Sequence, residues 1–166
     1  MAMLRRYRTS LGHGVHSPLA FGFITSALRD KRSAYYCFDT LGTVPHRLKR
    51  LARRLVRVAC FADARDVLVI GSPDPVVLKA LGEAVGPLTT DAAAYIGRMI
   101  VVASPKTDVI HADPSGALTV IAVLDMRAWD SLTATWPGAM TFTNGREGYL
   151  LLRRNLPSAR YTLNFR

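Results

Sequence analysis

The hydrophobic pattern is clearest in the middle of the chain. Residues 67–70, Val-Leu-Val-Ile, form an apolar run without polar alternation, which predicts a parallel strand buried on both faces. Gly71 ends this run. Asp74 and Pro75 then supply the N-cap and first residue of a helix whose apolar positions continue to Gly86. This strand, elbow and helix form the opening unit of an α/β nucleotide-type fold, in which ligands bind where the strand ends.

Two amphipathic helices are predicted before this unit. The first follows the capping signal Ser17-Pro18 and extends for about three turns. The second opens at Thr43 and Pro45 and carries arginines at three- and four-residue spacing, which places them in one stripe: Arg47, Arg50, Arg54 and Arg57. This stripe is the predicted binding surface for nucleic-acid phosphates or an acidic partner, and a solvated helix face is the alternative.

Further strands are predicted in the second half of the chain. Residues 99–103 and 108–112 are separated by too few residues for a parallel crossover, so either neighbouring strands are antiparallel there or one segment is not a strand. Asn144-Gly145 predicts a hairpin turn. A short helix is predicted over residues 128–136. The complete set of later strands is predicted at 88–91, 99–103, 108–112, 118–125, 139–143, 149–153 and 161–165.

These elements predict an α/β fold of three layers, Rossmann-like, with a reduced, mixed sheet and a C-terminal antiparallel strand set. Residues 1–42 are expected to form a basic arm, a helix and an aromatic connector, and residues 43–166 the α/β domain. A length of 166 residues with 49% hydrophobic residues is enough for one structural unit with a real core. The truncated sheet would leave an edge, at residues 161–165, that could pair with a second chain to form a homo-oligomer.

Charge is placed unevenly along the chain. The formal net charge is +10, and residues 1–66 hold 13 Lys and Arg against 4 Asp and Glu. The N-terminal part therefore carries nearly all of the basic excess. Such asymmetry indicates contact with nucleic acid, anionic lipid or an acidic partner, or else a solvated helix face with a basic tail.

Cysteine and histidine usage limits the remaining classes. Cys37 and Cys60 have no pairing or metal spacing and follow no signal peptide, so reduced thiols in a cytoplasmic protein are expected. His13 and His16 lack a third ligand, so turn or cap hydrogen bonds are expected there and no metal site is predicted. The longest apolar runs are too short to cross a bilayer, and the elbow has neither a nucleophile motif nor a phosphate-loop lysine.

Several local sequences follow one another in a distinctive order. HGVHSP precedes an aromatic helix, YYCF follows it, RLARRLVRVACF leads into VLVIG, and LDMRAWDS, GYLLLRRN and YTLNF complete the series. In this order they resemble a group of class I S-adenosylmethionine-dependent methyltransferases of the Bacteroidetes lineage. The resemblance covers nearly the whole chain, although the chain is short for that family, and HGVHSP is its most specific part. It implies a methyltransferase-type fold with S-adenosylmethionine as the cofactor.

The resemblance also implies where that cofactor would lie. Gly71, Ser72 and Asp74 form the elbow after the first strand, and Asp91 and Asp113 stand at later strand ends where the fold places ligand contacts. No catalytic residue is predicted. Methyl transfer chiefly requires positioning of the two substrates, so it leaves no fixed catalytic motif.

The chain departs from the family at this same corner. An acid and a glycine-rich turn are expected there, but the acidic position holds Val69 and the turn contains Pro73 and Pro75. The Asp74 carboxylate would itself cap the helix. We therefore expect a non-catalytic scaffold with weakened or lost cofactor binding, and the alternatives are an active small methyltransferase on an unknown acceptor or a basic module that binds nucleic acid or protein.

Overall fold

The structure is a computed structural model that describes residues 15–30, 35–93, 95, 97–107, 110–112 and 116–165. The helices are α2 (Pro18–Gly22) with its π-helical continuation η1 (Phe23–Leu28), the 3-10 helix η2 (Tyr36–Leu41), α3 (His46–Ala62), α4 (Pro75–Val85), the 3-10 helix η3 (Met126–Ala128) and α5 (Trp129–Thr135). The strands are β1 (Val67–Gly71), β2 (Leu88–Thr89), β3 (Met99–Ala103), β4 (Thr119–Val123), β5 (Met140–Thr143), β6 (Gly148–Leu152) and β7 (Ala159–Thr162).

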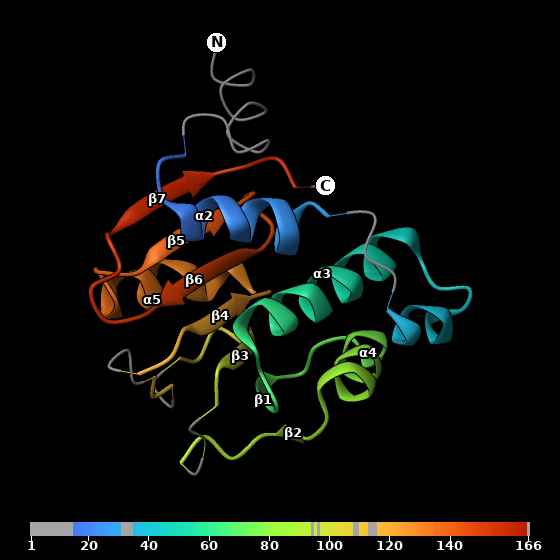
Figure 1. Ribbon diagram of the computed structural model, residues 1–166. Helices are drawn as coiled ribbons and strands as arrows, with labels where there is room; N and C mark the ends of the chain where they lie inside the picture. Colours follow the sequence, from blue (N-terminus) through green and yellow to red (C-terminus); the bar gives the residue numbers. More distant parts are fainter. Residues whose placement is uncertain are drawn as a thin grey trace.

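The strands form one mixed sheet in the order β2-β1-β3-β4-β6-β5-β7 (Figure 1). Strands β2, β1, β3 and β4 are parallel, β6 runs antiparallel to both β4 and β5, and β5 is parallel to β7. The predicted α/β class and mixed sheet are thus confirmed. The parallel strands β1, β3, β4 and β5 all end at one edge, where β6 begins, and this carboxyl edge holds both candidate sites described below.

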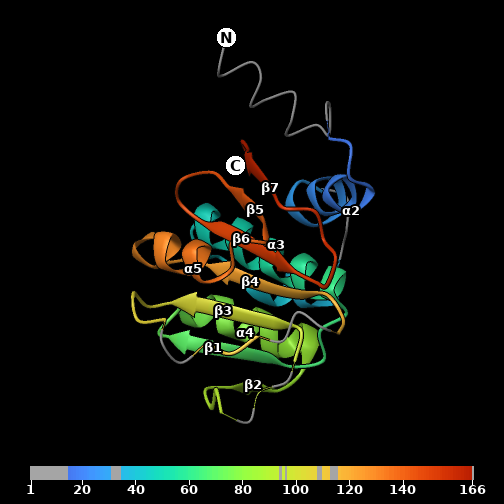
Figure 2. The same cartoon turned by 90° about the vertical axis from the view of Figure 1, so that its left-hand side faces the viewer.

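Helices cover the two faces of the sheet unequally. Figures 1 and 2 show α2, α3 and α4 on one face and α5 on the other. Alternate residues of β1 face opposite ways, because Val69 belongs to the core beneath the first group and Ile70 to the core beneath α5. Loop residues Tyr95 and Ile110 also enter the second core. Loops therefore bury part of the face that crossover helices would cover in a full-size fold of this kind.

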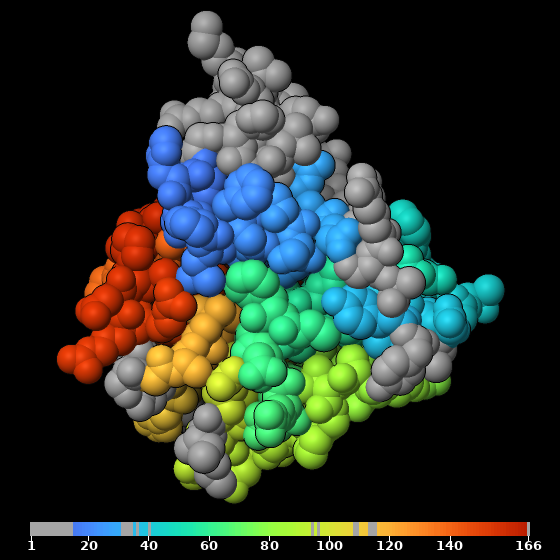
Figure 3. All heavy atoms as spheres, viewed as in Figure 1, coloured from blue at the N-terminus to red at the C-terminus, as the bar shows by residue number. Residues whose placement is uncertain are grey.

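The first described helical segment shares the main core with the sheet. The ring of Phe23 in η1 lies 4.8 Å from that of Phe142, 5.2 Å from that of Phe61 and 5.8 Å from that of Tyr149, centroid to centroid. Ser17 caps α2 as predicted, since its hydroxyl accepts a hydrogen bond from the Ala20 N–H at 3.3 Å. Figure 3 shows this segment, in blue, lying directly against α3, in green.

One predicted strand is wrong in the part that the structure describes. Residues 110–112 are not in a strand, and residues 108 and 109 lie outside the described residues. This agrees with the second of the two alternatives, that one segment is not a strand, and it leaves a connection from β3 to β4 long enough for a parallel crossover. Ile110 is only 6% exposed and belongs to the core beneath α5. This burial explains why the sequence around Ile110 is as apolar as that of a buried strand.

The C-terminal strands confirm the hairpin and shift the last strand. Asn144 and Gly145 begin the turn between the antiparallel strands β5 and β6. The final strand is predicted at 161–165 but occupies Ala159–Thr162 at the outer edge of the sheet. It lies parallel to β5, so the predicted C-terminal antiparallel set is confirmed for β5 and β6 and is wrong for β7. Leu163 and Phe165 are instead buried side chains of the main core. The edge is therefore formed by β7, and pairing of this edge with a second chain stays a prediction.

Candidate functional site

The elbow after β1 is closed by a close approach of two backbones. The strand order reverses direction at β1, with β2 on one side and β3 on the other, which is where sheets of this kind bind ligands. Gly71 pairs with Ala103 of β3 and has a φ of +87°. A Cβ on Gly71 would lie 2.4 Å from the Ala103 carbonyl oxygen and 2.9 Å from the Ser104 Cβ. Only glycine fits here, and any larger side chain at this position would push the ends of β1 and β3 apart.

The helix that follows the elbow has its first donors occupied by its own residues. The Asp74 carboxylate accepts a hydrogen bond from the Val76 N–H at 2.9 Å, and the Asp74 carbonyl accepts from the Val77 and Leu78 N–H groups at 2.9 and 3.2 Å. Pro75 has no N–H to offer. The predicted cap by Asp74 is confirmed. These are the groups that a helix N-terminus otherwise presents to an anion, and here they are satisfied internally.

The remaining residues of the predicted cofactor set lie apart or have local roles. Gly71, Ser72 and Asp74 share the elbow, and Asp91 follows β2 at the same edge of the sheet. The Asp91 carboxylate is exposed and accepts a hydrogen bond from the Ala93 N–H at 3.0 Å, so it shapes its own turn. Asp113 lies outside the described residues.

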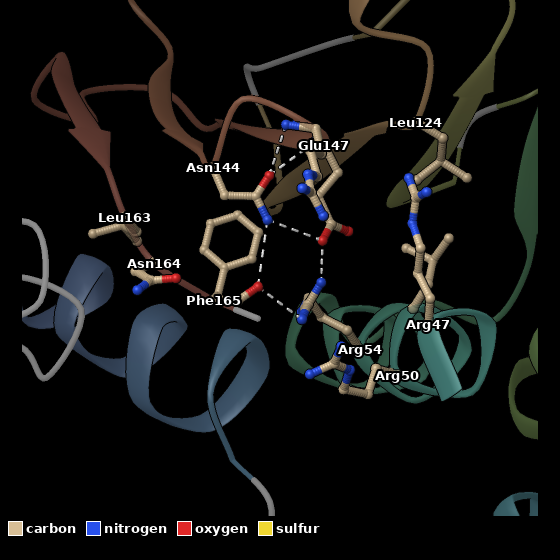
Figure 4. A pocket seen from close by; sticks show the side chains of 11 residues that line it. Arg47, Arg50, Arg54, Leu124, Asn144, Glu147, Leu163, Asn164 and Phe165 are labelled. Atoms are coloured by element: carbon tan, nitrogen blue, oxygen red, sulfur yellow. Dashed lines mark hydrogen bonds and ion pairs between the residues drawn. The ribbon is translucent and has the colours of Figure 1, made fainter. Parts of the chain in front are cut away.

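A second region of the carboxyl edge is open. A pocket of about 620 Å³ lies between the N-terminal half of α3, the end of β4, the β5–β6 turn and the segment after β7 (Figure 4). Its lining combines arginines, asparagines and apolar side chains, and we call it the arginine pocket: Arg47, Arg50, Leu51, Arg54, Leu124, Asn144, Arg146, Glu147, Leu163, Asn164 and Phe165.

Arg54 belongs to the floor of the arginine pocket. Its side chain forms an ion pair with the Glu147 carboxylate, and it donates hydrogen bonds to the carbonyl oxygens of Phe165 at 3.0 Å and Leu28 at 3.4 Å. Its guanidinium also lies 5.0 Å from the Phe165 ring centroid. Only 5% of Arg54 is exposed. Its hydrogen-bonding capacity is therefore used to join α3 to the β5–β6 turn and the C-terminal segment, as the dashed lines in Figure 4 show.

Glu147 is fully engaged within this floor. One carboxylate oxygen accepts from Arg54 and from the Asn144 side-chain amide, and the other accepts from the Tyr149 hydroxyl at 2.9 Å. Burial, with the Glu147 charge beside it, raises the pKa of Tyr149 well above its ordinary value. Tyr149 thus stays a neutral donor. The Glu147 carboxylate is bound to these partners and therefore does not neutralise the arginines at the rim of the pocket.

The β5–β6 turn is fixed by hydrogen bonds of its own. The Asn144 side-chain oxygen accepts from the N–H groups of Arg146 at 2.8 Å and Glu147 at 3.1 Å, and the Thr143 hydroxyl accepts from the Gly145 N–H at 3.0 Å. Gly145 adopts a φ of +83°, which glycine accepts readily. The turn therefore holds Arg146 in a defined position at the mouth of the pocket.

The rim carries positive charge without compensation. Arg47, Arg50 and Arg146 are exposed, and none of them has an acidic partner among the residues that the structure describes. Arg47 and Arg50 point from one face of α3, and Arg146 comes from the opposite wall. Three arginine side chains therefore line one cavity. Such an arrangement attracts anions, and no described acidic side chain neutralises it.

The predicted arginine stripe is corrected by this structure. Arg47 and Arg50 are exposed as expected, but Arg54 and Arg57 are buried and cannot form one surface with them. The Arg57 side chain donates to the Ala27 carbonyl at 3.0 Å, and burial, followed by the charge of Arg54, lowers the pKa of Arg57. Sequence reasoning missed Arg146, because no local spacing connects the hairpin with α3.

Metal sites, disulfide bonds and membrane-spanning helices are all absent from the described residues. Within the described ranges, no group of three or more His, Cys, Asp or Glu side chains is placed to hold a metal ion. Neither Cys37 nor Cys60 forms a disulfide bond in the described structure. None of the helices described here is long and apolar enough to cross a membrane.

Comparison with known proteins adds no family to these observations. Protein families, curated proteins and solved structures were each compared with the chain, and none of them matches it. Function is therefore inferred from the sequence and geometry of the chain itself.

Proposed function

We propose that this chain is a class I methyltransferase-like scaffold that has lost S-adenosylmethionine binding and works by binding rather than by catalysis. Two observations support the kinship. The motifs from HGVHSP to YTLNF occur in the order that the resemblance requires. The sheet combines a parallel set with an antiparallel strand between its C-terminal members, in keeping with the Rossmann-like fold expected from that resemblance.

The main evidence for the loss of cofactor binding is that the N–H donors at the start of α4 are already hydrogen-bonded. A nucleoside cofactor with a carboxylate needs free N–H groups and room for close backbone approach at this corner. Pro75 lacks the first N–H, Asp74 accepts from the next ones, and Gly71 lies against the Ala103 carbonyl. An added carboxylate would meet the Asp74 carboxylate instead of unsatisfied donors, which is repulsive.

The position of the missing acid supports the same proposal. Val69 stands where an acid is expected and is only 5% exposed, with its side chain in the core beneath the helices. Asp91 is the described acid of the predicted set that follows a neighbouring strand, and one of its carboxylate oxygens accepts a hydrogen bond from its own turn. The end of β1 therefore lacks the acid that the resemblance leads us to expect there.

Calorimetric titration of the full chain with S-adenosylmethionine tests the proposal. We expect no saturable heat, and no rise in the unfolding temperature when the cofactor is present. The second readout is sensitive, because a ligand at 100 times its dissociation constant stabilises a protein by about 2.7 kcal/mol. Saturable binding in the micromolar range would overturn the proposal and favour an active small methyltransferase.

The alternative function, a basic module that binds nucleic acid or protein, is supported by the exposed arginines near the start of α3. Arg47 and Arg50 are exposed without acidic partners among the described residues, whereas Arg54 and Arg57 are engaged inside the protein. Filter binding with the Arg47→Glu and Arg50→Glu double variant tests contact with nucleic acid or an acidic partner. Unchanged binding would remove this alternative. Substitution of Arg54 is unsuitable for the test, because it would break the buried floor.

A further inference from the structure

We propose that the arginine pocket binds a compact ligand carrying a di- or triphosphate group. The proposal concerns a different corner of the sheet from the one that the resemblance assigns to the cofactor, so it stands or falls independently of the proposed function. It rests on the charge, geometry and rigidity of the pocket.

The charge of the pocket favours a ligand with several negative charges. Arg54 and Glu147 neutralise each other in the floor, and Arg47, Arg50 and Arg146 have no acidic partner in the part of the chain that the structure describes. A single carboxylate is satisfied by one guanidinium fork. Phosphate groups offer more oxygens in more directions, and arginine forks bind them in a bidentate manner. Three guanidinium groups from two facing walls therefore match a chain of two or three phosphates.

The shape of the pocket favours a compact ligand over an extended nucleic acid. Its volume of about 620 Å³ lies within the range typical of small-molecule sites. The basic row on α3 ends at Arg50, because Arg54 and Arg57 are turned into buried contacts with Glu147 and Ala27. A nucleic-acid strand that followed α3 would find no further exposed arginine in this row.

The walls of the pocket are set before any ligand arrives. Asn144 joins the turn to the floor, since its side-chain amide donates to Glu147 and to the Phe165 carbonyl at 3.3 Å each. The side-chain oxygen of Asn144 accepts a hydrogen bond from the Arg146 N–H and so fixes the backbone of Arg146. Binding therefore requires only rotation of the three rim arginines, and the cost of ordering the backbone is avoided.

The source of the phosphates is left to the experiment. Leu51, Leu124 and Leu163 give the pocket apolar wall as well as charge. This surface suits the uncharged part of a phosphate ester, such as a nucleoside, but an inorganic polyphosphate carries the same recognised group. Tripolyphosphate, ATP and citrate are the three probes that distinguish these sources from a carboxylate polyanion.

Isothermal titration of the full chain with tripolyphosphate, ATP and citrate is the test. We expect saturable one-to-one binding of tripolyphosphate or ATP and weaker binding of citrate, with affinity falling as salt rises from about 50 to about 200 mM. Tighter binding of ATP would assign the apolar wall to a nucleoside, and equal binding would assign the site to the phosphates alone. Each of these two outcomes supports the phosphate site.

Rim variants show whether the binding belongs to this pocket. The Arg50→Ala and Arg146→Ala variants should each weaken binding by about tenfold or more, because each removes a charge-assisted hydrogen-bonding group. Arg50→Lys should lose part of the affinity, since it keeps the charge but not the fork. The double variant Arg153→Ala with Arg154→Ala is the matched control, because these exposed arginines follow β6 at the opposite edge of the sheet.

Four outcomes would overturn the proposal. They are no saturable binding of either phosphate probe at low salt, equal or tighter binding of citrate, equal weakening by the control variant, and tighter binding of a single-stranded oligonucleotide than of tripolyphosphate and ATP. The last of these would assign the rim to nucleic acid. Circular dichroism of each variant establishes that the rim substitutions leave the fold intact, as expected for exposed side chains.

Discussion

Two corners of the same sheet edge differ in what becomes of their polar groups. At the elbow after β1, Asp74 and Pro75 leave the start of α4 without free donors, and Gly71 closes against β3. At the arginine pocket, the buried charges of Arg54 and Glu147 satisfy each other and leave the rim arginines available. Whether a corner of the sheet can bind a ligand thus depends less on its position in the fold than on how many of its hydrogen-bond donors remain unsatisfied.

Removing the buried carboxylate should produce the largest effect. Glu147→Gln would leave the Arg54 charge buried without its ionic partner and should cost about 3 to 5 kcal/mol of unfolding free energy. Denaturant unfolding measures this loss. The control is Asp63→Asn, which makes the same change in an exposed ion pair with Arg98 and should cost less than about 1 kcal/mol. Equal losses for the two variants would contradict the account of the floor.

Filling the close approach at the elbow should have the next largest effect. Gly71→Ala combines a φ of +87° with a clash against the Ala103 carbonyl, so we expect a loss of about 3 kcal/mol. Gly145→Ala is the matched control, because Gly145 has a φ of +83° but nothing within 4 Å of its would-be Cβ. It should lose only about 1 kcal/mol, from backbone strain alone. Similar losses would show that the β1 and β3 ends can separate at little cost.

Much of the elbow could be predicted from the sequence, because its determinants are local. The uninterrupted apolar run gave β1, and Asp74 followed by Pro75 gave the capped start of α4, both within a few residues of one another. The Asn144-Gly145 turn was predictable for the same reason. Each of these features depends on backbone preferences that neighbouring residues determine.

The arginine pocket could be predicted only in part, because its determinants are distant in sequence. Helical spacing places Arg54 beside Arg50. The ion-pair partner that holds Arg54 in the interior, Glu147, lies 93 residues further along the chain. Arg146 reaches the same pocket through the pairing of β6 with β4, which no local pattern encodes. Likewise, Ile110 has the composition of a strand residue but is buried from a loop. Burial by tertiary contact overrode the local pattern in each case.

Removing the cap at the elbow should have a moderate effect. Asp74→Ala deletes the acceptor for the Val76 N–H and should cost about 1 kcal/mol, as helix caps usually do. Asp74→Asn keeps a good capping side chain and should cost far less. Thermal unfolding of both variants checks the difference. If Asp74→Ala gained saturable S-adenosylmethionine binding, the cap alone would be what closes the elbow.

Truncating the rim should have the smallest effect on stability. The double variant Arg47→Ala with Arg50→Ala removes exposed side chains that have no acidic partner among the described residues, so the unfolding free energy should change by less than about 0.5 kcal/mol. Relief of repulsion between these arginines should make any change favourable at low salt. A loss beyond about 1 kcal/mol would mean that the rim is part of the fold rather than a free binding surface.

Amide chemical-shift mapping of the labelled chain, with tripolyphosphate and with S-adenosylmethionine in parallel, tests the contrast between the two corners most directly. The account predicts saturable shifts at Arg50, Arg146 and Glu147 with tripolyphosphate and no saturable shift at Gly71 or Ser72 with either ligand. Saturable shifts at Gly71 and Ser72 with S-adenosylmethionine, and none at the rim with tripolyphosphate, would contradict it.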